Sequence, residues 1–152
     1  MFYNPFMRNK KRKTIAVAES CTGGLLGHRI TETPGASKYF LGGVIAYSDR
    51  IKESMLRVPR GLLRKHGAVS APAAKRMAEG VRKRFGAELG LGITGIAGPG
   101  GGSRTKPVGL VYIALARRGR TSCRKLLLSG KRSQIKRRAA KRALDWLRRA
   151  ST

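Results

Sequence analysis

The stretch AESCTGG, residues 18–24, brings together side chains that nucleophilic catalysis requires. Ser20 and Cys21 supply a hydroxyl and a thiol, Glu19 precedes them, and two glycines follow. Because the apolar run TIAVA comes before the stretch and LLGHRI after it, we expect a strand-to-helix turn here. Free N–H groups at such a turn stabilise anions and developing negative charge. The alternative interpretation is a polar helix start whose small residues only pack against the strand.

A serine nucleophile needs a base, and the chain has only two histidines, His28 and His66. His28 lies too far along the predicted helix to touch Ser20, so we do not expect a Ser-His-Asp triad. A lysine can take the proton where its surroundings lower its pKa, and Lys52 in AYSDRIK is the candidate. Ser48 stands one helical turn before Lys52 and forms a rival Ser-Lys pair. A solvated helix lysine is the alternative for Lys52.

Cys21 offers a second chemistry, in which Glu19 would be the base and a lysine would complete an amidase site. Most free cysteines behave as small buried hydrophobes, and we favour that interpretation for Cys21.

A glycine-rich segment, TGIAGPGGG from Thr94 to Gly102, follows a predicted strand. It matches neither a Walker A loop nor the GxGxxG pattern, but its N–H groups can hold an oxyanion or a phosphate. The alternative is a flexible connector, although long loops between two strong strands are more often functional.

The elements that must position these groups alternate along the chain. Strands are predicted at 14–18, 40–47, 89–94, 108–116 and 120–128, and helices at 22–32, 49–56, 59–66, 70–85 and 133–149. Thr22 and Ser70 are the expected N-caps of two of these helices, and Gly42-Gly43 predicts a bulge or a close backbone approach. The order predicts an α/β fold: a three-layer α/β/α single domain with a mixed, mostly parallel sheet.

The composition fits one globular domain, with 152 residues of which 41% are hydrophobic. No run reaches the roughly 20 apolar residues of a membrane helix, and the N-terminus lacks a secretory h-region. The two cysteines form no metal or disulfide pattern, so we expect a cytoplasmic protein with no membrane association.

The charge is extreme, because 34 Lys and Arg stand against seven Asp and Glu, a net charge of +27. Such a field attracts nucleic acid whatever the fold, and basic runs cover 8–13 and 131–149. Weak, sequence-independent nucleic-acid binding is therefore expected; a basic surface without a dedicated partner is the alternative. On the last helix the periodicity directs a set of basic side chains to water: Lys136, Arg137, Lys141 and Arg148.

Several motifs in register resemble the C-terminal domain of the competence-damage-inducible protein family, whose stand-alone form is the nicotinamide-nucleotide amidase. They are TIAVAESCTGGLL, GGVIAYSDRIKESMLRVP, HGAVS, GITGIAGPGGG and TKPVGLVYIALA, and the resemblance spans about residues 14–147. It implies an amidase domain over 14–149 behind a basic N-terminal extension over 1–13, and we expect no molybdopterin-binding-like domain. We also expect a homo-oligomer, a dimer.

The resemblance implies hydrolysis of the carboxamide of nicotinamide mononucleotide to nicotinate mononucleotide and ammonia, without a metal or cofactor. It implies a Ser-Lys mechanism in which Ser20 is the nucleophile, Lys52 the base and Tyr47 their neighbour. The residues it places at the substrate are Thr22, Gly23, Thr94, Gly95 and Arg132.

The chain departs from the family pattern where acidic residues are usual, at Ala71-Pro72, Arg104-Thr105 and Lys131. These departures add positive charge around the site and favour binding of the substrate phosphate. They also leave an alternative function open: a catalytically weak or inactive family member acting as a basic nucleic-acid-binding protein.

Overall fold

Five strands form one mixed sheet in the order β2-β1-β3-β4-β5. The computed structural model describes residues 11–152. Strand β1 runs parallel to both of its neighbours, β2 and β3, whereas β4 is antiparallel to β3 and β5. The sheet is therefore mixed with a parallel core, as predicted. The strands are β1 (Ile15–Glu19), β2 (Phe40–Ile45), β3 (Leu89–Gly95), β4 (Leu110–Arg117) and β5 (Arg120–Leu127).

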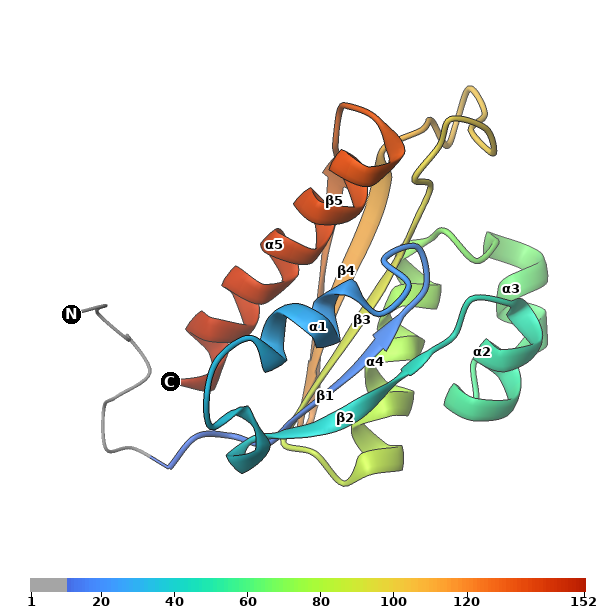
Figure 1. Ribbon diagram of the computed structural model, residues 1–152. Coiled ribbons are helices and arrows are strands. Elements are labelled where there is room, and N and C mark those ends of the chain that lie inside the picture. The colour runs from blue at the N-terminus through green and yellow to red at the C-terminus, as the bar shows by residue number, and fades with distance from the viewer. Residues whose placement is uncertain (1–10) are drawn as a thin grey trace.

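Helices cover both faces of this sheet and complete the three predicted layers (Figure 1). On one face lie α1 (Leu25–Thr31) and α5 (Arg132–Ser151), with a short 3₁₀ turn at Ala36–Lys38. On the other face lie α2 (Asp49–Leu56), α3 (Arg60–His66) and α4 (Ala71–Phe85). No helix within residues 11–152 has both the length and the apolar character that crossing a membrane requires.

Alternation along the buried strand β1 builds the two cores. Ile15 and Val17 pack with α1 and α5, whereas Ala16 and Ala18 pack with α4. Small residues bring α4 close to the sheet: a Cβ on Gly92 of β3 would stand 2.6 Å from the carbonyl oxygen of Ala74. Burial of these apolar faces, at about 25 cal/mol per Å², fixes the layers.

The predicted irregularity at Gly42-Gly43 is confirmed as a bulge in β2. Phe40 and Gly42 pair with the consecutive residues Ile15 and Ala16, which leaves Leu41 as the extra residue. Gly42 has φ 138°, a backbone conformation that side chains disfavour.

The prediction that Thr22 caps the first helix is wrong. Helix α1 begins at Leu25 and its N-cap is Gly24, which makes no side-chain capping bond. The Ser70 prediction is confirmed, since its Oγ accepts the Ala73 N–H at 3.2 Å. Of the predicted basic extension, residues 1–10 lie outside the described residues, and residues 11–13 adopt no regular structure.

Candidate active site

Three parallel strands bring the candidate residues to one edge of the sheet. Ser20 follows β1, Lys52 lies on the helix after β2, and Thr94 stands at the end of β3. The connection from β1 leads to β2 on one side of β1, whereas β3, the next strand in the chain, lies on the other side of β1. Ligands in open α/β sheets bind outside the carboxyl ends of strands at such a switch point.

Ser20 and Lys52 meet at this edge. Lys52 Nζ lies 3.2 Å from Ser20 Oγ and donates a second hydrogen bond to the Tyr47 carbonyl at 3.3 Å. The lysine is 1% exposed and the serine 8% exposed. The solvated-lysine alternative is therefore wrong for Lys52, because the side chain is among the most deeply buried in the domain.

Burial lowers the pKa of Lys52 below the ordinary value of a lysine, because the ammonium form loses hydration. The Asp49 carboxylate, with Oδ1 3.9 Å from Nζ, acts in the opposite direction and favours the ammonium. Asp49 is mostly exposed, so solvent screens its effect and burial prevails. The environment thus favours the neutral amine, the form that can accept a proton, more than water does.

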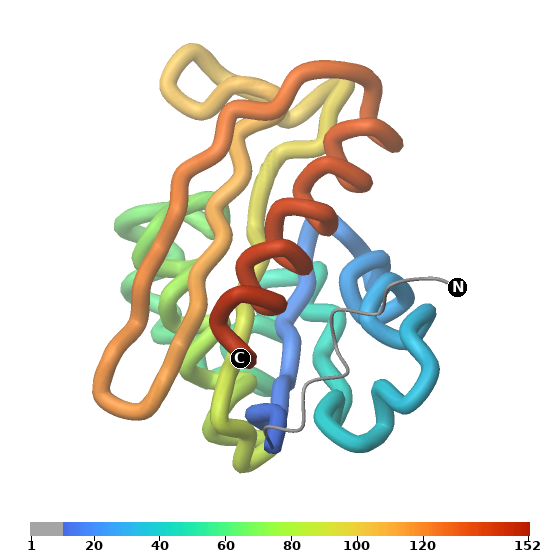
Figure 2. Tube along the Cα trace, turned by 90° about the vertical axis from the view of Figure 1, so that its left-hand side faces the viewer, coloured from blue at the N-terminus to red at the C-terminus, as the bar shows by residue number. Residues whose placement is uncertain are grey.

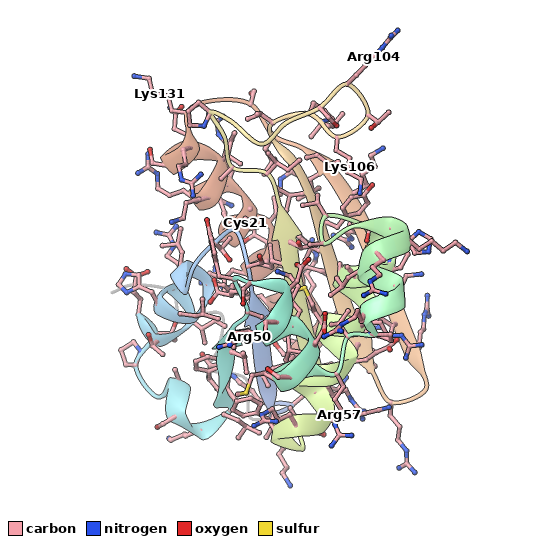
Figure 3. All side chains as sticks on the ribbon, turned by 90° about the vertical axis from the view of Figure 1, so that its right-hand side faces the viewer. Cys21, Arg50, Arg57, Arg104, Lys106 and Lys131 are labelled. Atoms are coloured by element: carbon pink, nitrogen blue, oxygen red, sulfur yellow. The ribbon has the colours of Figure 1, made fainter. Side chains whose placement is uncertain are left out.

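The rival nucleophiles have other environments. Ser48 Oγ accepts the N–H of Ile51 at 3.2 Å and caps α2, while Lys52 points away to Ser20. Cys21 is buried, which raises the pKa of its thiol to about 12 and keeps it protonated. Figure 3 shows Cys21 within the body of the domain, whereas Arg104 and Lys131 extend outward from it. Of the three candidates, only Ser20 has a base beside it.

Glu19 has a role that the sequence analysis missed. Its carboxylate is 2% exposed and accepts three backbone N–H groups at the start of α1, those of Gly24, Leu26 and Gly27, at 3.2, 2.8 and 3.0 Å. It thereby caps α1 from the preceding strand and holds the turn that carries Ser20. The signal was present in the sequence: a carboxylate precedes a turn whose own N-cap, a glycine, has no side chain.

Tyr47 contacts Lys52 through its backbone and Arg132 through its side chain. The Tyr47 hydroxyl accepts a hydrogen bond from Arg132 Nη2 at 3.1 Å. Arg132 Nη1 donates to the Gly98 carbonyl at 2.6 Å, so the arginine connects α5, the glycine-rich loop and the segment after β2. The Tyr47 ring is 61% exposed and leaves an aromatic surface open beside the site.

The remaining predicted substrate residues occupy different positions. Thr94 is buried and its Oγ1 donates to the Ala68 carbonyl at 2.8 Å, which joins β3 to the segment before α4. Gly95 packs against β4, because a Cβ there would stand 2.7 Å from Val111 Cγ2. Gly23, with φ 58°, forms the turn after Ser20. Thr22 is 1% exposed, and its hydroxyl has no hydrogen-bond partner among the described residues.

Lys136 was predicted to face water, and this prediction is wrong. The side chain is half-buried and its Nζ lies 3.7 Å from where a Cβ of Gly23 would stand. Helix periodicity explains the difference, because Lys136 precedes Ala139 and Ala140 by three and four residues and therefore lies on the same inward face of the helix. At the N-terminal end of α5 that face extends beyond the core and lies over the turn that carries Ser20.

Within residues 11–152 the structure contains no group of three His, Cys, Asp or Glu side chains placed to hold a metal ion. The basic side chains at the site are Lys52, Arg132 and Lys136.

Comparisons with known proteins agree with this architecture. The family model described as "CinA C-terminal domain" matches residues 6–151. A CinA-like protein of Gemmatimonas aurantiaca is 56% identical over 137 residues, 90% of this chain and 32% of the relative. A putative competence-damage inducible protein of Desulforudis audaxviator is 53% identical over 127 residues, 84% of this chain and 31% of the relative. The chain thus spans about a third of the length of these relatives.

Solved structures show the same fold. The competence/damage inducible protein CihA of Agrobacterium tumefaciens superposes with a TM-score of 0.88 at 38% identity, covering 92% of this chain and 86% of that one. A CinA superfamily protein of Enterobacter cloacae gives 0.87 at 26% identity, covering 100% and 99%. The chain belongs to the family of CinA C-terminal domains.

Proposed function

We propose that this domain is an amidohydrolase that removes ammonia from the carboxamide of nicotinamide mononucleotide, with Ser20 as nucleophile and Lys52 as base. The observation that carries the proposal is the buried Lys52 Nζ at 3.2 Å from Ser20 Oγ. A serine hydroxyl attacks an amide only when a neighbouring group takes its proton, and a lysine with a lowered pKa does so without histidine. The choice of substrate rests on the resemblance of the motifs to the nicotinamide-nucleotide amidase.

The first half of the reaction forms an ester. With Lys52 neutral, Ser20 Oγ–H donates to Nζ, and Oγ attacks the carboxamide carbon as its proton moves to the lysine. The tetrahedral intermediate collapses when the Lys52 ammonium protonates the amide nitrogen and the C–N bond breaks. Ammonia leaves, and the nicotinoyl group remains esterified to Ser20.

The second half regenerates the enzyme. Lys52, neutral again, removes a proton from water, and the hydroxide oxygen attacks the ester carbon. Collapse breaks the bond to Oγ, which recovers its proton from Lys52. The Tyr47 carbonyl receives an N–H of Lys52 and holds the amine in line throughout both steps.

Exposed apolar and cationic groups around the dyad support a pyridine nucleotide as the substrate. Ile45 is 56% exposed and lies against Gly24, and the neighbouring Tyr47 ring is exposed, so both offer surface to an aromatic ring. Arg132 and Lys136 place positive charge beside the turn and suit the phosphate of a mononucleotide.

Ammonia release from nicotinamide mononucleotide by the purified protein tests the proposal. We expect turnover by the wild type, a loss of at least about a thousandfold in Ser20→Ala, and a measurable rate in the matched variant Ser48→Ala. Cys21→Ala should also remain active, since its thiol stays protonated. A wild-type protein that releases no ammonia, or an active Ser20→Ala variant, contradicts it.

A further inference from the structure

The outward side of α5 is almost entirely basic. Residues 131–149 contain nine Lys or Arg and a single acid, Asp145. Arg132 is held by the Gly98 carbonyl and the Tyr47 hydroxyl, and Lys136 is half-buried; the other cations point into solvent. We define the α5 basic face as the four basic residues along the side of the helix that faces β5: Arg138, Lys141, Arg142 and Arg149.

The α5 basic face borders a groove shared with the edge strand β5, which runs beside α5 (Figure 2). The groove has a volume of about 340 Å³, and Lys141, Arg142 and Arg149 line it from the helix. From β5, Arg124 also lines it, with its guanidinium 4.1 Å above the Trp146 ring, and the rest of the lining is Asp145 and the apolar side chains of Ile113, Leu126 and Trp146. Cations thus stand on both walls.

The single acid in this groove does not cancel its charge. Asp145 Oδ2 lies 2.8 Å from Lys141 Nζ, so the carboxylate is matched within its own helix. Arg124, Arg142 and Arg149 make no ion pair with an acid among the residues that the structure describes. An array of like charges held by a rigid helix is stabilised by a polyanion that lies along it.

We propose that the α5 basic face and Arg124 bind the phosphate backbone of a nucleic-acid duplex without reading its sequence. Arg138 and Arg149 are eleven residues apart, about 16 Å along the helix axis. One strand of a duplex presents a phosphate about every 3.4 Å of its axis, so each cation has a phosphate within its range. Among the described residues, the exposed aromatic Tyr47 lies after β2 and Trp146 in the groove is buried, so base stacking is not part of the contact.

An anionic membrane fits this surface less well. Helices that lie on membranes combine Lys and Arg with exposed Trp, Phe or Leu that enter the acyl region. The exposed large hydrophobics of the described chain are Leu41, Ile45, Tyr47 and Leu127. The first three lie in or after β2, and Leu127 alternates with Leu126 and so faces the opposite side of the sheet.

Fluorescence anisotropy of a labelled 20-base-pair duplex, titrated with protein at several salt concentrations, tests the proposal. Five phosphate contacts, four from the α5 basic face and one from Arg124, give a log–log slope of about −4.5 and a loss in affinity of about 500-fold between 50 and 200 mM salt. The triple variant Arg138→Gln, Arg142→Gln, Arg149→Gln leaves Lys141 and Arg124, so it should reduce the slope to about −1.8 and the loss to about 12-fold. Duplexes of unrelated sequence should bind equally.

A matched variant separates this surface from the bulk charge of the protein. Arg64→Gln, Lys65→Gln, Arg84→Gln removes the same three charges from exposed positions on helices α3 and α4, across the sheet. We expect its slope to change by less than about one. Equal losses in the two triple variants, or no wild-type binding at 50 mM salt, would overturn the proposal.

Vesicles containing phosphatidylserine provide the remaining arm of the experiment. If the α5 triple variant lost vesicle binding but kept duplex binding, the surface would be a membrane site and the proposal would be wrong. All substituted side chains lie outside the Ser20–Lys52 site, so unchanged ammonia release confirms that the variants are folded.

Discussion

The substitution Glu19→Gln isolates the cap that holds the Ser20 turn. Gln keeps the shape of Glu but replaces one carboxylate oxygen by an NH₂ group. Two of the three backbone N–H donors, those of Gly24 and Leu26, share Oε1, and the third, that of Gly27, uses Oε2. In the variant a single amide oxygen replaces the two carboxylate oxygens, and the NH₂ group occupies the position of the other. At least one backbone N–H at the start of α1 therefore faces another donor instead of an acceptor.

The magnitude follows from these bonds. A buried N–H left without an acceptor costs about 1–3 kcal/mol. Each remaining hydrogen bond changes from a charge-assisted to a neutral one, which costs about a further 1 kcal/mol. The loss of a negative charge at the N-terminus of α1 adds about 1 kcal/mol. Relief of carboxylate desolvation offsets part of this sum. We expect a net decrease of about 2–3 kcal/mol in the free energy of unfolding.

Chemical denaturation monitored by circular dichroism measures the change, with Glu32→Gln as the control. Glu32 is a half-exposed partner of His28 and Arg29 at 3.5 and 3.8 Å, so its loss should cost less than about 0.5 kcal/mol. If Glu19→Gln unfolded like the wild type, the carboxylate would not be the cap. If it kept full stability but lost all ammonia release, Glu19 would act on the substrate.

Three further outcomes follow from the site. Thr22→Val removes a buried hydroxyl that lacks a hydrogen-bond partner within the described chain, so it should raise the free energy of unfolding by about 1 kcal/mol. A simultaneous fall in ammonia release would show that the hydroxyl contacts the substrate. Lys136→Gln should raise KM for nicotinamide mononucleotide about tenfold or more with little change in kcat, and should leave the phosphate-free riboside unaffected; an equal effect in Lys141→Gln would contradict this. Ammonia release should rise with pH as Lys52 loses its proton, at a pH below the ordinary lysine pKa. Asp49→Asn should move this rise to lower pH, because it removes the carboxylate that favours the Lys52 ammonium. A shift to higher pH would refute the role of Lys52 as the base.

The sequence predicted the layers and strands because hydrophobic periodicity is a local property. The runs around Val17, Leu91 and Ile113 each form the expected strand, and the Ser70 cap follows from local hydrogen bonding. The pairing of Ser20 with Lys52 was open on spacing alone. It depends on β1 and β2 being parallel neighbours, which no local pattern contains.

Two positions were misjudged, for reasons that can be stated physically. Thr22 has the side chain of a cap, but Glu19 reaches the same N–H groups from the strand before it and carries a full charge. Lys136 was classed by its charge, although its position in the helix is inward. For Lys52, the predicted base, a solvated lysine stayed open as the alternative in a chain with 34 Lys and Arg, and only the tertiary packing shows that the side chain is buried.

Rapid mixing with nicotinamide mononucleotide, acid quenching within the first turnover and peptide mapping by mass spectrometry test the central claim most directly. We predict an ester of nicotinate mononucleotide, with its ribose phosphate still attached, on the peptide that contains Ser20, formed together with the first equivalent of ammonia and absent from Ser20→Ala. An ester on Cys21 or Ser48, or ammonia released from a protein whose Ser20 stays unmodified at every quench time, would contradict the Ser20–Lys52 mechanism.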